Sequence, residues 1–172
     1  TYLALDPDLQ KEFSQAMGVR ALKNIMLSMM ARQGDETAFE LAYQQYEATG
    51  NMSERLGALR VLVWNDAPQA EAALRDFYLR FKDEALSLDQ WFTLQAAHPC
   101  ATTETIQYLT SHADYDLGVP NRIRSVSGGL NANPVNTWSF GVDHFIGLAK
   151  YLDEKNPIVG ARLLHVFSRR YT

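Results

Sequence analysis

Apolar residues recur along this chain at the three-to-four-residue spacing of amphipathic helices. The first four stripes comprise Leu22, Ile25, Met26, Met29 and Met30; Phe39, Ala42, Tyr43 and Tyr46; Met52, Leu56, Leu59 and Val63; and Leu74, Phe77, Tyr78 and Phe81. A period near 3.6 residues indicates helices, and no segment alternates convincingly as a strand would. We therefore predict an all-helical protein in which these faces, including the Met-rich face of residues 22–30, form the core.

Capping residues stand between the stripes and predict where helices begin. Asp35 can cap a helix that runs to about Thr49, and Ser87 with Gln90 has the spacing of a capping box. Further expected starts are Thr102 or Thr103, Asn121, and Asn156 followed by Pro157 as the first helical residue. Short connections between such helices favour antiparallel neighbours, which stack either into a bundle or into a solenoid. Helix pairs starting near residues 35, 67 and 103 favour the solenoid.

Residues 125–141 differ in character, because they are rich in glycine and asparagine. We expect an irregular connection between helices here, and a loop of this kind is a common place for function. Gly128-Gly129 follows no strand and precedes no Gly-Lys-Ser/Thr, so we interpret it as a packing or hinge feature rather than a phosphate loop. Trp138 is expected near the surface, whereas Trp64 and Trp91 are expected inside.

Composition excludes several classes of protein. The net charge of -4 and the lack of a basic run longer than Arg169-Arg170 argue against nucleic-acid binding. No stretch is long and apolar enough for a membrane span. The lone Cys100 excludes an internal disulfide and fits a reducing compartment, so the cytoplasm is the expected location. Because the chain begins at Thr1 without Met, we expect a piece of a longer protein.

Residues that could carry chemistry do not form a recognisable set. The histidines include no HExxH pair, and the spacing of His98, Cys100 and His112 matches no zinc pattern. No nucleophile elbow is present. The carboxylates Asp83, Glu84 and Asp89 are expected at a solvated helix edge or as first-turn caps. No catalytic or metal-binding residue is therefore assigned.

Arg122 and Arg124 stand in the first turn of the helix expected to begin at Asn121. Two positions along a helix are separated by about 200° around its axis, so the two guanidinium groups leave opposite sides. One is expected to pack and the other to reach outward. Two interpretations stay open: an ion pair with nearby acids that supports the fold, or a place at a cavity, where a fork of donors suits a carboxylate or peptide carbonyl.

Four motifs in order carry a resemblance to a known family. They are Asn51-Met52-Ser53 at a helix start, the residues Asp-Gln-Trp-Phe-Thr-Leu-Gln-Ala at 89–96, Pro120 to Ser125, and Asn156-Pro157 with Ala161-Arg162-Leu163. In order and spacing, from near residue 50 to the end, the chain resembles the C-terminal helical domain of the bacterial zinc aminopeptidase N family of gluzincin metallopeptidases.

The resemblance implies a fold and a function. The expected fold is all-α, a right-handed superhelix of antiparallel helix pairs of the armadillo/HEAT type, as a single domain over residues 1–172. Its partner is the catalytic domain of the same polypeptide, which carries HExxH, a glutamate ligand, a tyrosine and the zinc; this chain holds no cofactor. The helical domain closes over that catalytic domain and makes an internal cavity for peptide substrates. Arg124 and Arg162 are expected to face this cavity, with Asn121 and Arg122 supporting the turn that presents them.

The chain also departs from the family pattern. The segment between Asn133-Pro134 and Asn156-Pro157 is shorter than usual, so any contact it makes with substrate is expected to differ. The family continues beyond Thr172, so we expect a C-terminally shortened fragment whose last helix exposes apolar residues. The alternative function is a free-standing helical-repeat module that binds a peptide or protein in its groove. A self-contained enzyme would require a ligand set that the sequence does not display.

Overall fold

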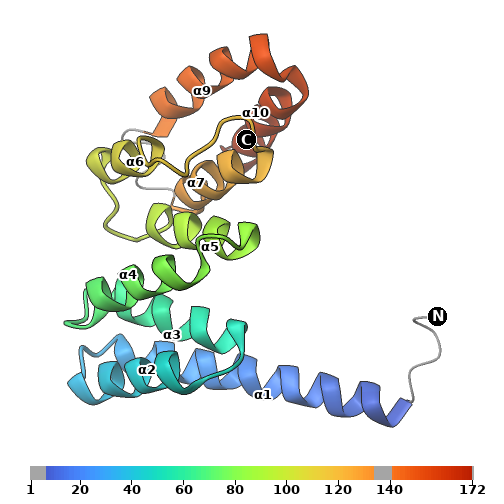
Figure 1. Cartoon of the computed structure of the whole chain (residues 1–172). Coiled ribbons are helices and arrows are strands. Elements are labelled where there is room, and N and C mark those ends of the chain that lie inside the picture. Colours follow the sequence, from blue (N-terminus) through green and yellow to red (C-terminus); the bar gives the residue numbers. More distant parts are fainter. Residues whose placement is uncertain (1–6, 134–140, 172) are drawn as a thin grey trace. The chain divides into compact units, whose positions relative to one another are not determined.

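The computed structural model describes the backbone of residues 7–133 and 141–171, and the side chains of residues 15–133 and 141–169. Within those ranges it contains helices and no strand, which confirms the all-helical prediction (Figure 1). The helices are α1 (Pro7–Ala31), α2 (Glu36–Ala48), α3 (Met52–Trp64), α4 (Ala70–Phe81), α5 (Ala85–Ala96), α6 (Thr103–Thr110), α7 (Pro120–Ala132), α9 (Val142–Lys155) and α10 (Pro157–Tyr171). None of the described helices has the length and hydropathy needed to cross a membrane.

The chain divides into two compact units, Thr1–Asp76 and Phe77–Thr172, with the boundary inside α4. In the first unit, α1, α2 and α3 pack on one another. The expected cap at Asp35 is confirmed, since its side chain accepts a hydrogen bond from the Thr37 amide at 2.9 Å. Asn51, which the sequence placed at a helix start, accepts one from the Ser53 amide at 3.0 Å. These bonds satisfy amides that have no partner within the helix, so they fix where α2 and α3 begin.

The Met-rich face of α1 is exposed, so the prediction that it forms core is wrong. Met29 is 65% exposed and Ile25 56%. Among the described side chains of α1, Leu27 and Ala31 are buried, and they share a helix face with Asn24. The Asn24 amide donates to the Ser53 carbonyl oxygen at 3.1 Å and its oxygen accepts from Gln45 at 2.9 Å. The hydrogen bonds of Asn24 thus lie on the packed face of α1, whereas the spacing of apolar residues alone predicted that the opposite face would be buried.

In the second unit, α5 packs on α7 and α6, and α10 packs on α9 and α7. Its buried side chains include Trp91, Phe92, Ile123, Val126, Leu130, Phe145 and Leu152. Trp91 is inside as expected, whereas Trp64 in the first unit is only half-buried. The structure confirms that α6 starts after the Thr102 cap and that α10 starts after Asn156.

Helix α7 corrects two expectations. It begins at Pro120 after Val119, not at Asn121, because proline suits the first helical position and leaves Asn121 inside the first turn. Residues 125–132 are helical rather than irregular. A methyl group on Gly129 would lie 2.9 Å from Ala96 Cβ, so glycine permits α7 to approach α5 closely. The packing interpretation of this glycine is confirmed. Trp138 and the rest of the expected loop, residues 134–140, lie outside the described residues.

The expected capping box of Ser87 and Gln90 is also wrong. Helix α5 begins at Ala85, directly after Glu84, so Ser87 lies within the first turn. Ser87 is buried, and its hydroxyl donates to the Glu84 carboxylate at 3.1 Å. The reciprocal capping bonds occur instead at the start of α6, where Thr102 and Thr105 each bind the other's backbone amide.

Candidate functional site

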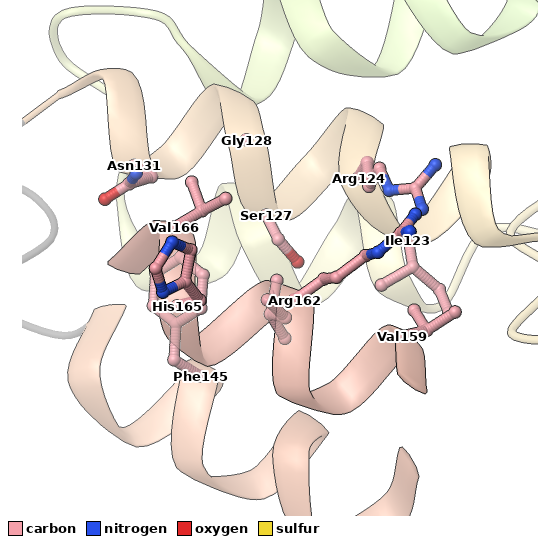
Figure 2. A pocket seen from close by; sticks show the side chains of 11 residues that line it. Ile123, Arg124, Ser127, Gly128, Asn131, Phe145, Val159, Arg162, His165 and Val166 are labelled. Carbon is pink, nitrogen blue, oxygen red and sulfur yellow. The ribbon is translucent and has the colours of Figure 1, made fainter. Parts of the chain in front are cut away.

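A cavity of about 400 Å³ lies between α7 and α10 in the second unit, with α9 contributing one side chain (Figure 2). It is lined by Ile123, Arg124, Ser127, Gly128, Asn131, Phe145, Val159, Arg162, Leu163, His165 and Val166. This volume lies within the range of pockets that hold small ligands. We call it the α7–α10 pocket.

Helical periodicity explains why these residues meet. On α7, Arg124, Ser127, Gly128 and Asn131 stand at positions i, i+3, i+4 and i+7, and Val159, Arg162, Leu163 and Val166 repeat that spacing on α10. Such sets lie along one side of a helix. The two helices pack with these sides toward each other, and Gly128 between them leaves space, since a methyl group there would contact nothing within 4 Å.

The walls of the pocket are apolar. Ile123 and Phe145 are almost completely buried, and Val159 and Leu163 are more than nine-tenths buried. Phe145 also contacts Phe167 in a tilted arrangement with 4.7 Å between ring centroids, which holds α9 against α10. The expectation that the last helix exposes apolar residues is correct only in part, since Val159 and Leu163 on α10 are buried while Val166 is 58% exposed. The pocket thus offers an apolar surface to a ligand.

Two arginines bring positive charge to this apolar pocket. The Arg124 guanidinium donates to the Asn121 side-chain oxygen at 2.9 Å, a neutral partner that orients it without compensating its charge. Arg162 forms no hydrogen bond or ion pair with the part of the chain that the structure describes. Both side chains are exposed, and Figure 2 shows them on the same side of the view. No carboxylate of the described residues lines the pocket, so an anion would be attracted to the two arginines.

Two buried polar atoms at the pocket lack partners among the described residues. They are the hydroxyl oxygen of Ser127, a residue with no exposed surface, and the side-chain oxygen of Asn131, which is 6% exposed. Buried polar atoms are rarely left without a hydrogen bond, because their desolvation is not compensated. The sequence analysis missed both residues, although their spacing from Arg124 along one helix side was a usable signal. Because both atoms are buried, a ligand would contact them only after the surrounding side chains move.

Arg122, unlike Arg124, packs into the protein and does not line the pocket. Its Nε donates to Asp89 Oδ1 at 2.7 Å and its Nη1 donates to the Asp114 carbonyl oxygen at 2.6 Å, while its guanidinium carbon lies 5.0 Å from the centroid of the Phe92 ring. Both charged side chains are mostly buried. Asp89 is therefore not at a solvated edge as expected, because α7 covers it. Arg122 and Arg124 leave opposite sides of α7, and a role for any of these residues in substrate binding stays a prediction.

A second, more open hollow of about 380 Å³ borders α6 and α9 and includes Tyr115 and His144. The Tyr115 hydroxyl and His144 Nε2 are buried without partners in the described chain. Burial raises the pKa of Tyr115 to about 12 and lowers the pKa of His144, because both charged forms lose hydration. Both groups are therefore neutral near pH 7, and the hollow carries less charge than the α7–α10 pocket.

The described residues do not form a metal centre. In those ranges, no group of three or more histidine, cysteine, aspartate or glutamate side chains is placed to hold a metal ion. His98 and His112 use ring nitrogens to accept hydrogen bonds from the backbone amides of Cys100 and Asp114 at 3.0 and 3.2 Å. The described donor set therefore does not fit a resident zinc ion.

Comparison with known proteins shows that this helical chain is similar to a part of several aminopeptidases. It is 30% identical over 155 residues to aminopeptidase N of Escherichia coli and 30% identical over 174 residues to aminopeptidase N of Caulobacter vibrioides, covering 87% and 93% of this chain but 18% and 20% of those proteins. The crystal structure of Legionella pneumophila aminopeptidase A in complex with aspartic acid matches with a TM-score of 0.74 and 27% identity over 85% of this chain and 18% of that one.

The chain thus spans about a fifth of the relatives that it matches. Residues 2–171 match the family described as "Domain of unknown function (DUF3458_C) ARM repeats". This match confirms the expected helical-repeat fold of armadillo type and the resemblance to the C-terminal helical domain of aminopeptidase N. The chain belongs to the DUF3458_C family of ARM-repeat domains, which it shares with a part of these aminopeptidases.

Proposed function

We propose that this chain is a noncatalytic helical domain of a zinc aminopeptidase N that removes N-terminal residues from peptides. In the whole enzyme it caps the catalytic domain of the same polypeptide and shapes the internal cavity that peptide substrates enter. The α7–α10 pocket faces that cavity, with Arg124 and Arg162 beside the substrate path and with Asn121 and Arg122 holding the first turn of α7.

The observation that carries this proposal is the pair of arginines at one apolar pocket, where no described carboxylate lies among the lining residues. Peptide substrates present carbonyl oxygens, carboxylates and apolar side chains, which these groups complement. The likeness to aminopeptidases over a fifth of their length supports the assignment of catalysis to another part of the protein. Zinc would be held there, since the described residues here provide no ligand set. We also propose a cytoplasmic location, which fits the lone Cys100.

Turnover by the whole aminopeptidase tests this role. We expect Arg124→Ala to lower kcat/KM for peptides of three or more residues by about tenfold, since a hydrogen bond from a charged group contributes about 1.5–3 kcal/mol. Hydrolysis of a small chromogenic amide, which is too short to reach the pocket, should stay within about twofold of the unmodified enzyme.

Arg75→Ala supplies the matched control. Arg75 is exposed on α4 and does not line the pocket, so this variant removes the same charge without removing a pocket group. It should leave both reactions unchanged. Equal losses on peptides and on the small amide after Arg124→Ala would contradict a peptide-contacting role.

The polypeptide that contains this chain in its source cells provides a separate test. An antibody raised to the chain should capture a product several times heavier than 19.4 kDa that contains zinc and releases N-terminal residues. A metal-free product of the size of the chain itself would instead indicate a free-standing helical-repeat module.

A further inference from the structure

We infer that the hollow bordering α6 and α9 binds an alkyl cation, that is, an ammonium or guanidinium group on an aliphatic stem. This hollow shares no lining residue with the α7–α10 pocket, and the inference does not depend on the proposed function. It follows from the charge of the lining residues, from their polar and aromatic groups, and from the open space beside one glycine of α9.

One side of α9 forms most of the hollow. Asp143, Gly147 and Tyr151 stand at positions i, i+4 and i+8 of this helix. His144 and Leu148 repeat the four-residue spacing one position further on. Residues at this spacing share a side of a helix. The end of α6 and the connection that follows it contribute the other lining residues, and the volume of about 380 Å³ suits a small ligand.

Charge favours a cation in the hollow. Asp143 is exposed, and it forms no hydrogen bond or ion pair with the part of the chain that the structure describes. It lies in the first turn of α9, where the helix dipole stabilises an ionised carboxylate. No lysine or arginine of the described residues lines the hollow, and burial lowers the pKa of His144, so its imidazole is neutral near pH 7. The described lining residues therefore carry one negative charge that no positive charge among them compensates.

Two uncharged polar groups of the hollow can accept hydrogen bonds from a cation. The Tyr115 hydroxyl oxygen and His144 Nε2 have no partner among the described residues. Both atoms can accept a hydrogen bond, the nitrogen when the imidazole carries its proton on Nδ1. Because both atoms are buried, a ligand would contact them only after the side chains that cover them move. The N–H groups of a cation would then supply the hydrogen bonds that these atoms lack.

The other lining groups suit a cation that is carried on an aliphatic stem. The Tyr151 side chain is 44% exposed, and the face of an aromatic ring attracts a cation. Leu117 and Leu148 provide apolar surface. A methyl group on Gly147 would meet nothing within 4 Å, so the helix surface is open there. A stem that covers these groups adds hydrophobic free energy, which a bare inorganic cation cannot gain.

Nuclear magnetic resonance titration of the 172-residue chain tests the inference. The probes are butylammonium, its neutral counterpart 1-butanol, its anionic counterpart butyrate, and ammonium, which has no stem. We expect butylammonium to bind about tenfold more tightly than 1-butanol, because attraction to Asp143 and to the Tyr151 ring is added. It should also bind more tightly than butyrate and ammonium, with shifts centred on the amides of His144, Gly147 and Leu148. Binding of 1-butanol or of ammonium as tight as that of butylammonium would overturn the inference.

Two further probes identify the source of the cation. The amides of acetyl-lysine and acetyl-arginine carry an ammonium and a guanidinium group on a stem that is attached to a peptide unit. If either binds as tightly as butylammonium, the hollow accepts a side chain of another polypeptide, and if both bind more weakly, it accepts a free amine. Either result supports an alkyl-cation site.

Variants connect the binding to the hollow. Asp143→Asn should remove most of the difference between butylammonium and 1-butanol, whereas Asp153→Asn, which removes the same charge from α9 outside the hollow, should retain it. Gly147→Leu keeps every polar group but places a side chain in the open space, so it should abolish the shifts. All three positions are exposed, and circular dichroism checks that each chain is folded. Unchanged binding of butylammonium in Asp143→Asn or in Gly147→Leu would overturn the assignment.

Discussion

The two adjacent glycines of α7 should respond in opposite ways to the same substitution. Gly129 lies where α7 packs on α5, and an added methyl group would be 2.9 Å from the Thr93 carbonyl oxygen and 3.1 Å from the Ala97 amide nitrogen. Neither backbone atom can move without a shift of α5. Gly128 is exposed, and a methyl group there would meet nothing within 4 Å.

The magnitudes follow from two opposing effects. Replacing a helical glycine by alanine stabilises the folded state by about 1 kcal/mol, because glycine loses more backbone entropy on folding. Gly128→Ala should therefore gain about 1 kcal/mol. Gly129→Ala has the same gain, but forcing a methyl group into a packed contact costs about 1–3 kcal/mol. The contact with backbone atoms places this site toward the upper end, so we expect a net loss of about 1–2 kcal/mol.

Urea unfolding of the 172-residue chain, followed by circular dichroism, measures the difference. The midpoint should rise for Gly128→Ala and fall for Gly129→Ala relative to the unmodified chain, with similar slopes. Because the residue change and the helix are identical, local propensity cancels between the two variants. A Gly129→Ala chain as stable as the Gly128→Ala chain would mean that α5 and α7 separate easily and that glycine is not required at their contact.

Three other perturbations test the packing and the electrostatics of the fold. Asp89→Ala leaves the buried Arg122 charge without its carboxylate, so the free energy of unfolding in urea should fall by about 3–5 kcal/mol. Asp83→Ala, at an exposed position, should change it little, and equal urea midpoints for the two variants would contradict the pairing of Asp89 with Arg122. Asn51→Ala removes the cap of α3 and should lower the free energy of unfolding by about 1 kcal/mol, measured by thermal unfolding, whereas Asn51→Asp should be nearly neutral. Burial lowers the pKa of His144, so the unfolded chain binds a proton more readily than the folded chain. The free energy of unfolding should therefore fall as the pH drops below about 6.5. His144→Gln should remove that part of the pH dependence, and an unaltered pH profile in this variant would contradict the role of His144.

Much of the local structure followed from the sequence because it depends on neighbours along the chain. Asp35 caps α2 through a bond to an amide two residues ahead, so its position in the sequence was sufficient. Asn51 was expected only at a helix start, and the structure shows that its side chain caps α3 through amides two and three residues ahead. The same reasoning failed at Ser87 and Asn121. Each lies inside a helix that starts earlier, after Glu84 and Val119, neither of which makes a side-chain capping bond. A capping residue in the sequence marks a possible start, and packing of the whole helix selects among the candidates.

The glycine pair at 128–129 shows where residue preference misleads. Glycine and asparagine favour loops, which predicted an irregular segment. The helix continues through them because close contact with α5 stabilises it, and a side chain at Gly129 would prevent that contact. Exposure of the Met-rich face of α1 has a related cause, since the partner that covers a stripe is not encoded in its spacing.

The candidate site was also predictable from the sequence only in part. By itself the sequence determined that Arg122 and Arg124 leave opposite sides of one helix, because the angle between neighbouring positions is a property of the helix. Only the tertiary structure decided that Arg122 is the buried partner of Asp89, 33 residues away, and that Arg124 and Arg162 share a pocket with Ser127 and Asn131. These contacts join residues on different helices, and their formation depends on how the helices pack, which no local pattern specifies.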